Sequence, residues 1–304
     1  MAKSGQAPAA TPIVLLYRLI SGSVAMLPNW LLRALAWGLA FMLVRGVKLR
    51  RPLVRQNIAI ALPTTSLAEQ DRIYLESVYH FVLTLFETVA GGWMTLASTV
   101  TIEGDEELHQ ALAQGKGCLI LCIHMGNWEA LAASVSRGVA PTSVVVKKIG
   151  DGPVDAFVLW LRHRAGFQAL QRKTKGDVYR RILEALKTNQ IVGFVMDQYQ
   201  PGAPEIDLFG VPARTNNGLA TIWRRTGAPV VPITIRRDGP HQHHAIILPP
   251  LELKVSADPQ ADVLEATQAF NHVIEEMILG NPEQYFWLHD RYKVGRQKAA
   301  PAPP

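Results

Sequence analysis

A histidine and a glutamate five residues apart follow a short apolar run near the middle of the chain. Residues 119–123 are all apolar, His124 follows directly, and Glu129 comes shortly after the pair Gly126-Asn127. An imidazole can act as a general base, and a carboxylate can hold it in the productive tautomer. Because no serine belongs to the pattern, the nucleophile would be a hydroxyl group of the substrate. His124 and Glu129 are therefore the candidate catalytic pair.

These two side chains can meet only if the backbone turns between them. On one continuous helix, positions i and i+5 point about 140° apart. The apolar run predicts a buried strand, and Asn127 is a typical N-cap for a helix that carries Glu129 near its start. His124 would then stand at the carboxyl end of a strand, where open α/β sheets bind ligands. The alternative is that His124 is an ordinary hydrogen-bonded core residue.

The remainder of the chain alternates between strand and helix patterns. Apolar runs predict strands at 100–103, 119–123, 142–147, 191–196, 229–236 and 244–248. Helical patterns cover 66–90, 106–114, 154–165, 177–187, 217–226 and 264–279, the first of them opened by a capping box at Ser66. This alternation predicts an α/β fold with a mostly parallel central sheet flanked by helices. Asp197 and Lys147 would lie at the carboxyl ends of two of these strands.

The N-terminal part is apolar and ends in a basic cluster. Pro28 divides the apolar stretch 13–47, which also contains Arg18 and Arg33. It could be a membrane-spanning helix, a hairpin in the membrane plane, or a buried helix pair. The basic residues that follow are typical of the cytoplasmic side of a membrane, or of a solvated helix face. They are Arg45, Lys48, Arg50, Arg51 and Arg55.

We expect four segments. Residues 1–12 are predicted to be disordered, 13–62 to form a hydrophobic membrane-associating helical segment with a basic exit, 63–296 to form the α/β domain, and 297–304 to be a disordered tail.

Composition limits the partners and the chemistry. The 304-residue chain is 48% hydrophobic, only 18% charged, and carries a formal net charge of +6, which favours an acidic or membrane partner. Nucleic acid is not expected, since the basic residues are scattered and no helix-turn-helix or aromatic platform is present. Cys118 and Cys122, four residues apart on one strand, cannot form a disulfide, and no metal-ligand spacing occurs. His241, His243 and His244 are expected to be exposed hairpin residues rather than metal ligands.

Several motifs in a fixed order carry a resemblance to a known family. They are Arg55-x-Asn57-Ile58, His124-x4-Glu129, the strand-end Asp197, Leu208-Phe209-Gly210-Val211-Pro212-Ala213-x-Thr215, and Pro282-Glu283-Gln284-Tyr285-x-Trp287-Leu288-His289-x-Arg291-Tyr292. This set resembles the lipid A biosynthesis acyltransferases, the lauroyl and myristoyl transferases of Gram-negative bacteria. The resemblance covers nearly the whole chain, including the apolar N-terminal segment.

The resemblance implies a fold similar to that of the glycerolipid acyltransferases, and an activity. A fatty acyl chain would move from an acyl carrier protein, or from coenzyme A, to a hydroxyl of a membrane glycolipid such as a lipid A precursor. The reaction would take place at the cytoplasmic face of the bacterial inner membrane. His124 matches the family's base and Glu129 its partner, and the family has an acidic residue at the position of Asp197. No cofactor and no metal are implied.

Other residues are assigned from the chemistry that this reaction needs. The tetrahedral oxyanion requires hydrogen-bond donors, and we expect these to be backbone N–H groups near Gly126 and Asn127, or a nearby cation. Arg164, Arg214, Arg291 and Lys147 could bind phosphates of the substrate. The alternative for each arginine is a solvated surface position.

The chain departs from the family pattern in two ways, which leave the acceptor open. It is short, and Pro28 and two arginines interrupt the N-terminal anchor. The acceptor could be another glycolipid, an amino-acid lipid or a pigment precursor. An alternative of another class is a non-enzymatic, basic lipid-binding protein of the membrane surface, and a third is a hydrolase that uses the same dyad on water.

Overall fold

The computed structural model describes residues 12–91, 96–149, 152–171, 176–239 and 241–294. The two stretches predicted to be disordered lie outside these ranges, apart from Pro12, which begins the first helix. The strands are β1 (Val100–Glu103), β2 (Cys118–Cys122), β3 (Thr142–Val146), β4 (Gln168–Gln171), β5 (Ile191–Val195), β6 (Glu205–Leu208), β7 (Val211–Arg214), β8 (Val230–Gly239) and β9 (Gln242–Ile247). The α-helices are α1 (Pro12–Ala25), α2 (Asn29–Phe41), α3 (Arg51–Ala61), α4 (Leu67–Ala90), α5 (Asp105–Ala113), α6 (Trp128–Gly138), α7 (Pro153–Ala165), α8 (Asp177–Lys187), α9 (Gly218–Thr226) and α10 (Pro259–Gly280).

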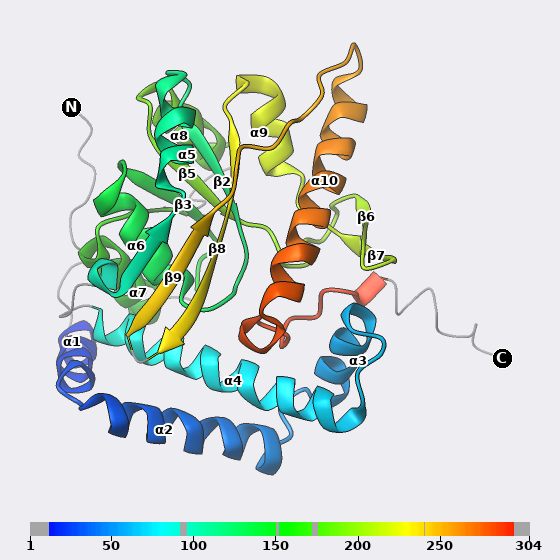
Figure 1. Cartoon of the computed structure of the whole chain (residues 1–304). Coiled ribbons are helices and arrows are strands. Elements are labelled where there is room, and N and C mark those ends of the chain that lie inside the picture. The colour runs from blue at the N-terminus through cyan, green and yellow to red at the C-terminus, as the bar shows by residue number, and fades with distance from the viewer. Residues whose placement is uncertain (1–11, 92–95, 150–151, 172–175, 240, 295–304) are drawn as a thin grey trace.

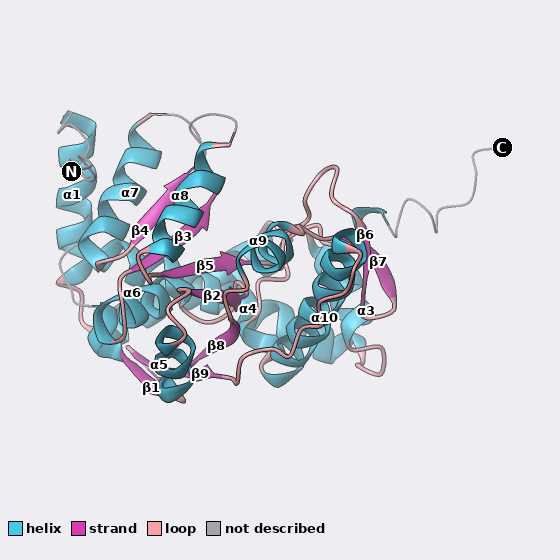
Figure 2. Ribbon diagram, turned by 90° about the horizontal axis from the view of Figure 1, so that it is seen from above, coloured by secondary structure: helices cyan, strands magenta, loops and turns pink. Residues whose placement is uncertain are grey.

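A seven-stranded sheet forms the centre of the described part of the chain (Figures 1 and 2). Its strand order is β1-β9-β8-β2-β5-β3-β4, and every neighbouring pair is parallel except β8 and β9, which form an antiparallel hairpin. Crossover helices connect the parallel strands, as parallel pairing requires. The predicted α/β class with a mostly parallel sheet is therefore confirmed.

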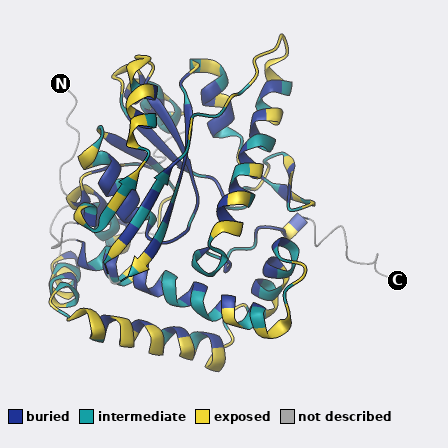
Figure 3. Ribbon diagram, in the orientation of Figure 1, coloured by how far each residue is buried: buried dark blue, intermediate teal, exposed yellow. Residues whose placement is uncertain are grey.

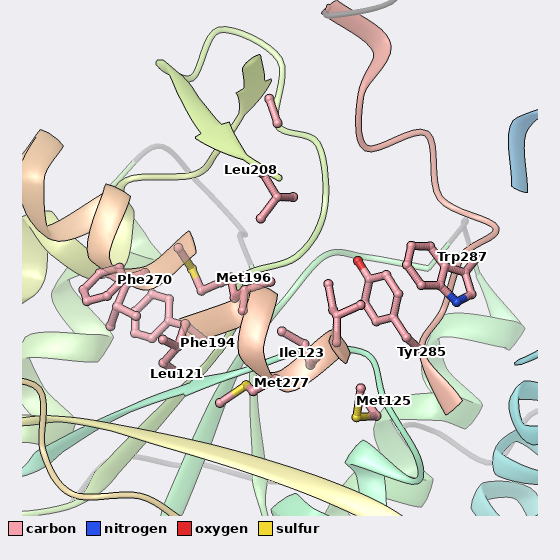
Figure 4. Close-up of a cluster of buried hydrophobic side chains, with 14 of the residues drawn as sticks. Leu121, Ile123, Met125, Phe194, Met196, Leu208, Phe270, Met277, Tyr285 and Trp287 are labelled. Carbon is pink, nitrogen blue, oxygen red and sulfur yellow. The ribbon is translucent and has the colours of Figure 1, made fainter. Parts of the chain in front are cut away.

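Alternating side chains of the central strands supply both faces of the sheet with apolar groups. Cys118, Ile120 and Cys122 point toward α5 and α6, whereas Leu119 and Leu121 point to the opposite face. On that opposite face α8, α9 and α10 complete the largest cluster of buried residues, part of which is shown in Figure 4. Strands covered on both sides must be apolar at every position, which is why β2 reads as a continuous hydrophobic run.

The N-terminal helices pack against α4 rather than standing apart from the domain. Leu32, Ala36 and Ala40 of α2 are buried in the same cluster as Leu119 and Leu121 of the sheet. Figure 1 shows α2 lying along α4 on the side away from the sheet. Within the described residues, no single helix is long and apolar enough to cross a membrane; α1 and the helix that starts at Asn29 pass that test only together, with a bend of 113° between them.

Local sequence signals located most helix starts. The Ser66 hydroxyl accepts a hydrogen bond from the Glu69 N–H at 3.2 Å, which confirms the N-cap predicted for α4. The Glu69 carboxylate pairs with Arg72 instead of completing the capping box. Likewise, the Asn127 side chain accepts from the Ala130 N–H at 2.9 Å and caps α6.

Two features of the sheet region were not predicted. β4 is a short edge strand with a Gln-Ala-Leu-Gln sequence, so it lacks an apolar run. β6 and β7 form a separate antiparallel pair within the Pro/Gly-containing loop after Asp197. Their two connecting residues, Phe209 and Gly210, both have positive φ, which matches the twist of a tight hairpin.

Candidate active site

The sheet register brings His124 and Asp197 together. Cys122 of β2 pairs with Val195 of β5, and each of the two polar residues follows two positions later on its own strand. Parallel neighbours have their carboxyl ends at the same edge of the sheet, so the two side chains leave the strands at the same level. The predicted position of His124 at the carboxyl end of a strand is confirmed.

Asp197 makes two contacts with the same histidine. Its Oδ1 lies 2.7 Å from the His124 ring Nδ1, and its Oδ2 accepts the His124 backbone N–H at 3.1 Å. An ionised carboxylate can only accept, so Nδ1 carries the ring proton and Nε2 presents a lone pair. A base held in one tautomer and one orientation is the result.

The charge state of Asp197 follows from these contacts. Burial alone would raise the pKa of the Asp197 carboxyl, but the His124 ring and the backbone N–H outweigh burial and hold that pKa below its ordinary value. Burial, and then the nearby Asp197 carboxylate, raise the pKa of the Tyr285 phenol well above its ordinary value. Tyr285 therefore stays protonated and does not compete with His124 for the role of base.

The structure corrects the predicted partner of His124. The Glu129 carboxylate is bound to Arg162 of α7, whose Nη2 donates to Oε1 at 2.6 Å and whose Nε donates to Oε2 at 3.1 Å. Both side chains are about nine-tenths buried. Glu129 lies in the first turn of α6, as expected, but that turn directs its carboxylate to the neighbouring helix, while Asp197 takes the imidazole. The pair observed is His124–Asp197, beside a second pair, Glu129–Arg162.

One of the expected oxyanion donors is already engaged. The Gly126 N–H donates to the Gln284 carbonyl at 3.2 Å, whereas the backbone N–H of Asn127 stays a predicted donor. A cation, Arg162, lines the same cavity as His124. Its Nη1 is buried and has no hydrogen-bond partner among the described residues, although its other nitrogens hold Glu129.

A cavity of about 550 Å³ begins at these residues and continues into the protein. Its walls come mainly from the sheet face of β2, β3 and β5 and from α6, including Ile120, Val144, Gly193, Leu131 and Val135. His124, Glu129 and Arg162 belong to the same lining. The Trp128 ring, centred 5.0 Å from the imidazole, also contributes. A long apolar space that starts at a base suits a flexible hydrocarbon chain.

Only one of the four predicted phosphate-binding residues lines this cavity. Lys147 does so, together with Gln198, Gln200 and Asn216. Arg291 is buried and donates to the Arg214 carbonyl and to Thr215 Oγ1, both at 2.7 Å, so it braces the chain rather than facing a ligand.

The other two arginines are also placed elsewhere. Arg214 belongs to β7, where it lies 3.8 Å from Glu205. Arg164 lies at the exposed end of α7, where its carbonyl accepts from Arg137. Neither contributes to the cavity lining.

Sequence reasoning missed the role of Arg162. The sequence analysis did not single it out, yet it lies on the buried face of α7 with Asp155, Leu161 and Ala165. A charged residue on the apolar stripe of a helix was the available signal. The expectation that the hairpin histidines are exposed was wrong for His243. This side chain is buried, and its Nε2 lies 3.3 Å from Glu87 Oε2. No group of three or more His, Cys, Asp or Glu side chains in the described ranges could hold a metal ion.

Comparison with known proteins agrees with this geometry. Residues 7–294 match the family model described as bacterial lipid A biosynthesis acyltransferase. The chain is 30% identical over 280 residues to the lipid A biosynthesis lauroyltransferase of Escherichia coli K12, covering 89% of this chain and 88% of the relative. It is 25% identical to the E. coli lipid A biosynthesis palmitoleoyltransferase, covering 82% and 80%. It is also 25% identical to a phosphatidylinositol mannoside acyltransferase of Mycobacterium tuberculosis, over 59% of each chain. The chain therefore belongs to the bacterial lipid A biosynthesis acyltransferase family, and it is an acyltransferase.

Proposed function

We propose that this enzyme transfers a fatty acyl chain from a thioester, carried by acyl carrier protein or coenzyme A, to a hydroxyl of a membrane glycolipid such as a lipid A precursor. The observation that carries the proposal is His124, which is held by Asp197 at one end of a mostly apolar cavity of about 550 Å³. The family supports acyl transfer, and the cavity supports a long-chain donor. Membership in a family of acyltransferases leaves no need for the non-enzymatic alternative.

The chemistry uses His124 on a hydroxyl group of the acceptor. The acceptor oxygen attacks the thioester carbonyl carbon while His124 Nε2 removes its proton, because an alcohol is too weak an acid to ionise at neutral pH by itself. Arg162, a cation in the lining of the same cavity as His124, stabilises the negative charge that develops on the carbonyl oxygen. The C–S bond then breaks, and the leaving thiolate takes the proton from the imidazolium. The ester and a free thiol are the products.

Glu129 acts through Arg162 in this scheme. A buried guanidinium without a counter-charge would be costly, and the forked contact with Glu129 fixes its plane. The family motif His-x4-Glu is thereby explained as two coupled functions. His124 moves the proton, and Glu129 holds the cation that receives the oxyanion.

The acceptor is the less determined partner. The cavity side chains Lys147, Gln198, Gln200 and Asn216 come from the ends of β3 and β5 and from the loop before α9, and they present hydrogen-bond donors suited to sugar and phosphate oxygens. The second candidate is acylation of a different lipid acceptor by the same chemistry. The likeness to a relative named phosphatidylinositol mannoside acyltransferase favours keeping that candidate.

The outer surface of α1 and α2 supports binding to the cytoplasmic face of the inner membrane. Figure 3 shows a nearly continuous exposed row along α2. The exposed apolar side chains of α1 and α2, named the apolar ridge here, include Leu15, Leu16, Leu19, Trp30, Trp37 and Phe41. An exposed apolar surface of this kind is typical of a site that contacts a protein or a membrane. The 13 residues of α2 continue into the five-residue π-helical turn Met42–Gly46, so the helix from Asn29 is about 27 Å long, shorter than the roughly 30 Å hydrocarbon core of a bilayer. The ridge therefore lies in the plane of the membrane, with Arg33 and Arg45 near the lipid phosphates.

The proposed base is tested by His124→Ala. Transfer of a radiolabelled acyl chain from acyl carrier protein to membrane lipid should fall by about 10² to 10⁴, because proton removal from the acceptor is lost. His163→Ala, a change of an exposed histidine on α7, is the matched control and should keep full activity. Wild-type-like transfer by His124→Ala, with the same lipid product by mass spectrometry, would exclude His124 as the base.

The assignment of separate functions to Asp197 and Glu129 is tested by a double-mutant cycle. Asp197→Asn should lower kcat by about 10² or more, because an amide can favour the wrong imidazole tautomer. Glu129→Gln should add no further loss in an Arg162→Met background, since Glu129 acts through Arg162. Asp197→Asn should still cause its full loss in that background. Steady-state kinetics on the single and double variants would reject the assignment if Glu129→Gln remained as harmful without Arg162.

The cavity as the acyl site is tested at Gly193, which faces the cavity from β5. A Cβ at this position would meet Val144 Cγ2 at 3.6 Å, an ordinary contact, so Gly193→Leu should fold and fill part of the space. Each excluded methylene forfeits about 0.8 kcal/mol, so kcat/KM for the longest accepted chain should fall about tenfold or more. Gly193→Ala is the graded control. Unchanged chain-length preference in a thioester series would contradict the assignment.

The apolar ridge is tested with the double variant Trp30→Ser/Trp37→Ser. Both rings are more than half exposed, so the melting temperature should change little, while partition onto vesicles containing anionic phospholipid should fall at least about tenfold. Leu67→Ser, at an exposed leucine of α4 outside the ridge, is the matched control. Equal vesicle binding by the wild type and the double variant in a sedimentation assay would show that the ridge is not the membrane contact.

A further inference from the structure

The loop between β2 and α6, residues 123–127, is held by hydrogen bonds from the segment after α10 and from α4. The Phe286 N–H donates to the His124 carbonyl at 3.0 Å, and the Gln284 carbonyl accepts the Gly126 N–H at 3.2 Å. The Thr84 hydroxyl donates to the Gly126 carbonyl at 2.6 Å. The backbone that carries the imidazole is thus held by three hydrogen bonds, from two different parts of the chain.

Gly126 leaves no space between this loop and β8. Its φ is +53°, and an added Cβ would lie 2.6 Å from the Ile235 carbonyl oxygen. Only glycine combines this backbone conformation with so close an approach. The loop therefore rests directly on the backbone of the neighbouring strand.

Asn127 joins the loop to a buried carboxylate. Its Oδ1 caps α6 through the Ala130 N–H, and its Nδ2 donates to Glu87 Oε2 at 2.8 Å. Asn127 is fully buried. The two halves of one amide therefore connect the start of α6 to the last turn of α4.

Glu87 is in turn held by the β8–β9 hairpin. Arg237 Nη1 donates to Glu87 Oε1, and Arg237 Nη2 donates to Thr84 Oγ1 at 3.2 Å. His243 Nε2 lies 3.3 Å from Glu87 Oε2. Burial would raise the pKa of Glu87, but His243 and Arg237 lower it to about 2, so the carboxylate is charged at neutral pH. Gln284 binds both the N–H and the carbonyl of Arg237, which closes the network onto the segment that also binds Gly126.

We propose that Thr84, Glu87 and Arg237, here called the Glu87 cluster, form a positioning device that acts through Asn127 and Gly126 to hold His124 at the distance and angle needed for proton removal. The inference rests on the proposed role of His124 as the base. None of the three residues belongs to the lining of the acyl cavity; Glu87 and Arg237 face a separate cavity of about 220 Å³. Their effect must therefore pass through the loop and not through contact with the acyl chain.

The energetics favour a positioning role over a purely stabilising one. A buried ion pair is often no more stabilising than apolar residues of the same volume. A network that fixes the position of the loop carrying His124 has a different benefit. A misplacement of about 1 Å at the reacting atoms can lower the rate by a factor of roughly 10². Hydrogen bonds connect Glu87, Arg237 and Asn127, and Arg237 Nε is the one nitrogen of the three side chains without a partner among the described residues. Buried polar networks of this kind can specify one arrangement.

The test separates helix capping from loop positioning. Asn127→Ser keeps an N-cap oxygen for α6, because serine caps about as well as asparagine, but it loses the donor to Glu87. Thr84→Val keeps the shape of the side chain and loses the hydroxyl that binds the Gly126 carbonyl. Ser66→Ala removes the hydrogen bond that caps the start of α4, at the end of the helix opposite to Glu87. It is the control for a small loss of stability.

We expect kcat for acyl transfer from dodecanoyl-acyl carrier protein to fall about 10- to 100-fold in Asn127→Ser and in Thr84→Val. The KM for this donor should stay within about twofold, since the cavity is untouched. The fold decrease in kcat of the double variant should be smaller than the product of the decreases in the two single variants, because both substitutions act on one loop. Ser66→Ala should lower the melting temperature with kcat unchanged.

Amide hydrogen exchange gives a second result that does not depend on activity. The amides of residues 124–126 should exchange faster in both loop variants and remain as in the wild type in Ser66→Ala. A wild type without acyl transfer would refute the proposed function, and hydrogen exchange would still decide whether the cluster holds the loop. With an active wild type, the inference is overturned by unchanged exchange, by kcat within twofold in both variants, or by a rise in donor KM in place of a fall in kcat.

Discussion

The Asp197 carboxylate, bound twice by His124, is the interaction on which the candidate site depends. A buried carboxylate is costly unless its oxygens are satisfied, and here the ring Nδ1 and the backbone N–H of the same residue satisfy both. This double contact exists only because β2 and β5 are parallel neighbours with a register that ends them at the same level. The strand order of the sheet is thus a requirement of the proposed chemistry, since it places His124 and Asp197 at one edge.

The position of His124, the proposed base, could be predicted from sequence, and its hydrogen-bond partner could not. His124 follows a buried strand directly, so its place at the sheet edge follows from local pattern. Glu129 was chosen because it is near in sequence and could fold back across a turn. The carboxylate that reaches the ring is 73 positions away, and only the order of strands in the folded sheet brings it there. Arg162 was missed for a similar reason, because its partner Glu129 lies on a different helix.

The fold could be predicted from the sequence more completely than the site, because the sequence signals of helices and strands are local. Helix caps at Ser66 and Asn127, and the unbroken apolar runs of β2 and β5, depend on residues within a few positions of one another. β4 was missed because half of it faces solvent at the edge of the sheet, where apolar residues are not required. The N-terminal helices are a mixed case. Their apolar character was evident, but their burial against α4 depends on tertiary contacts that periodicity does not specify.

The depth of the cavity has a consequence for how this architecture can diversify. His124, Asp197 and their supports lie at the edge of the sheet, whereas Val144 and Gly193 form part of the wall several residues further back along the strands. A change of side chain at those interior positions alters the space for a ligand and leaves the reacting groups in place. Descendants of one ancestral enzyme can therefore diverge in the molecules that they accept through single replacements in strand interiors, with the chemistry inherited intact.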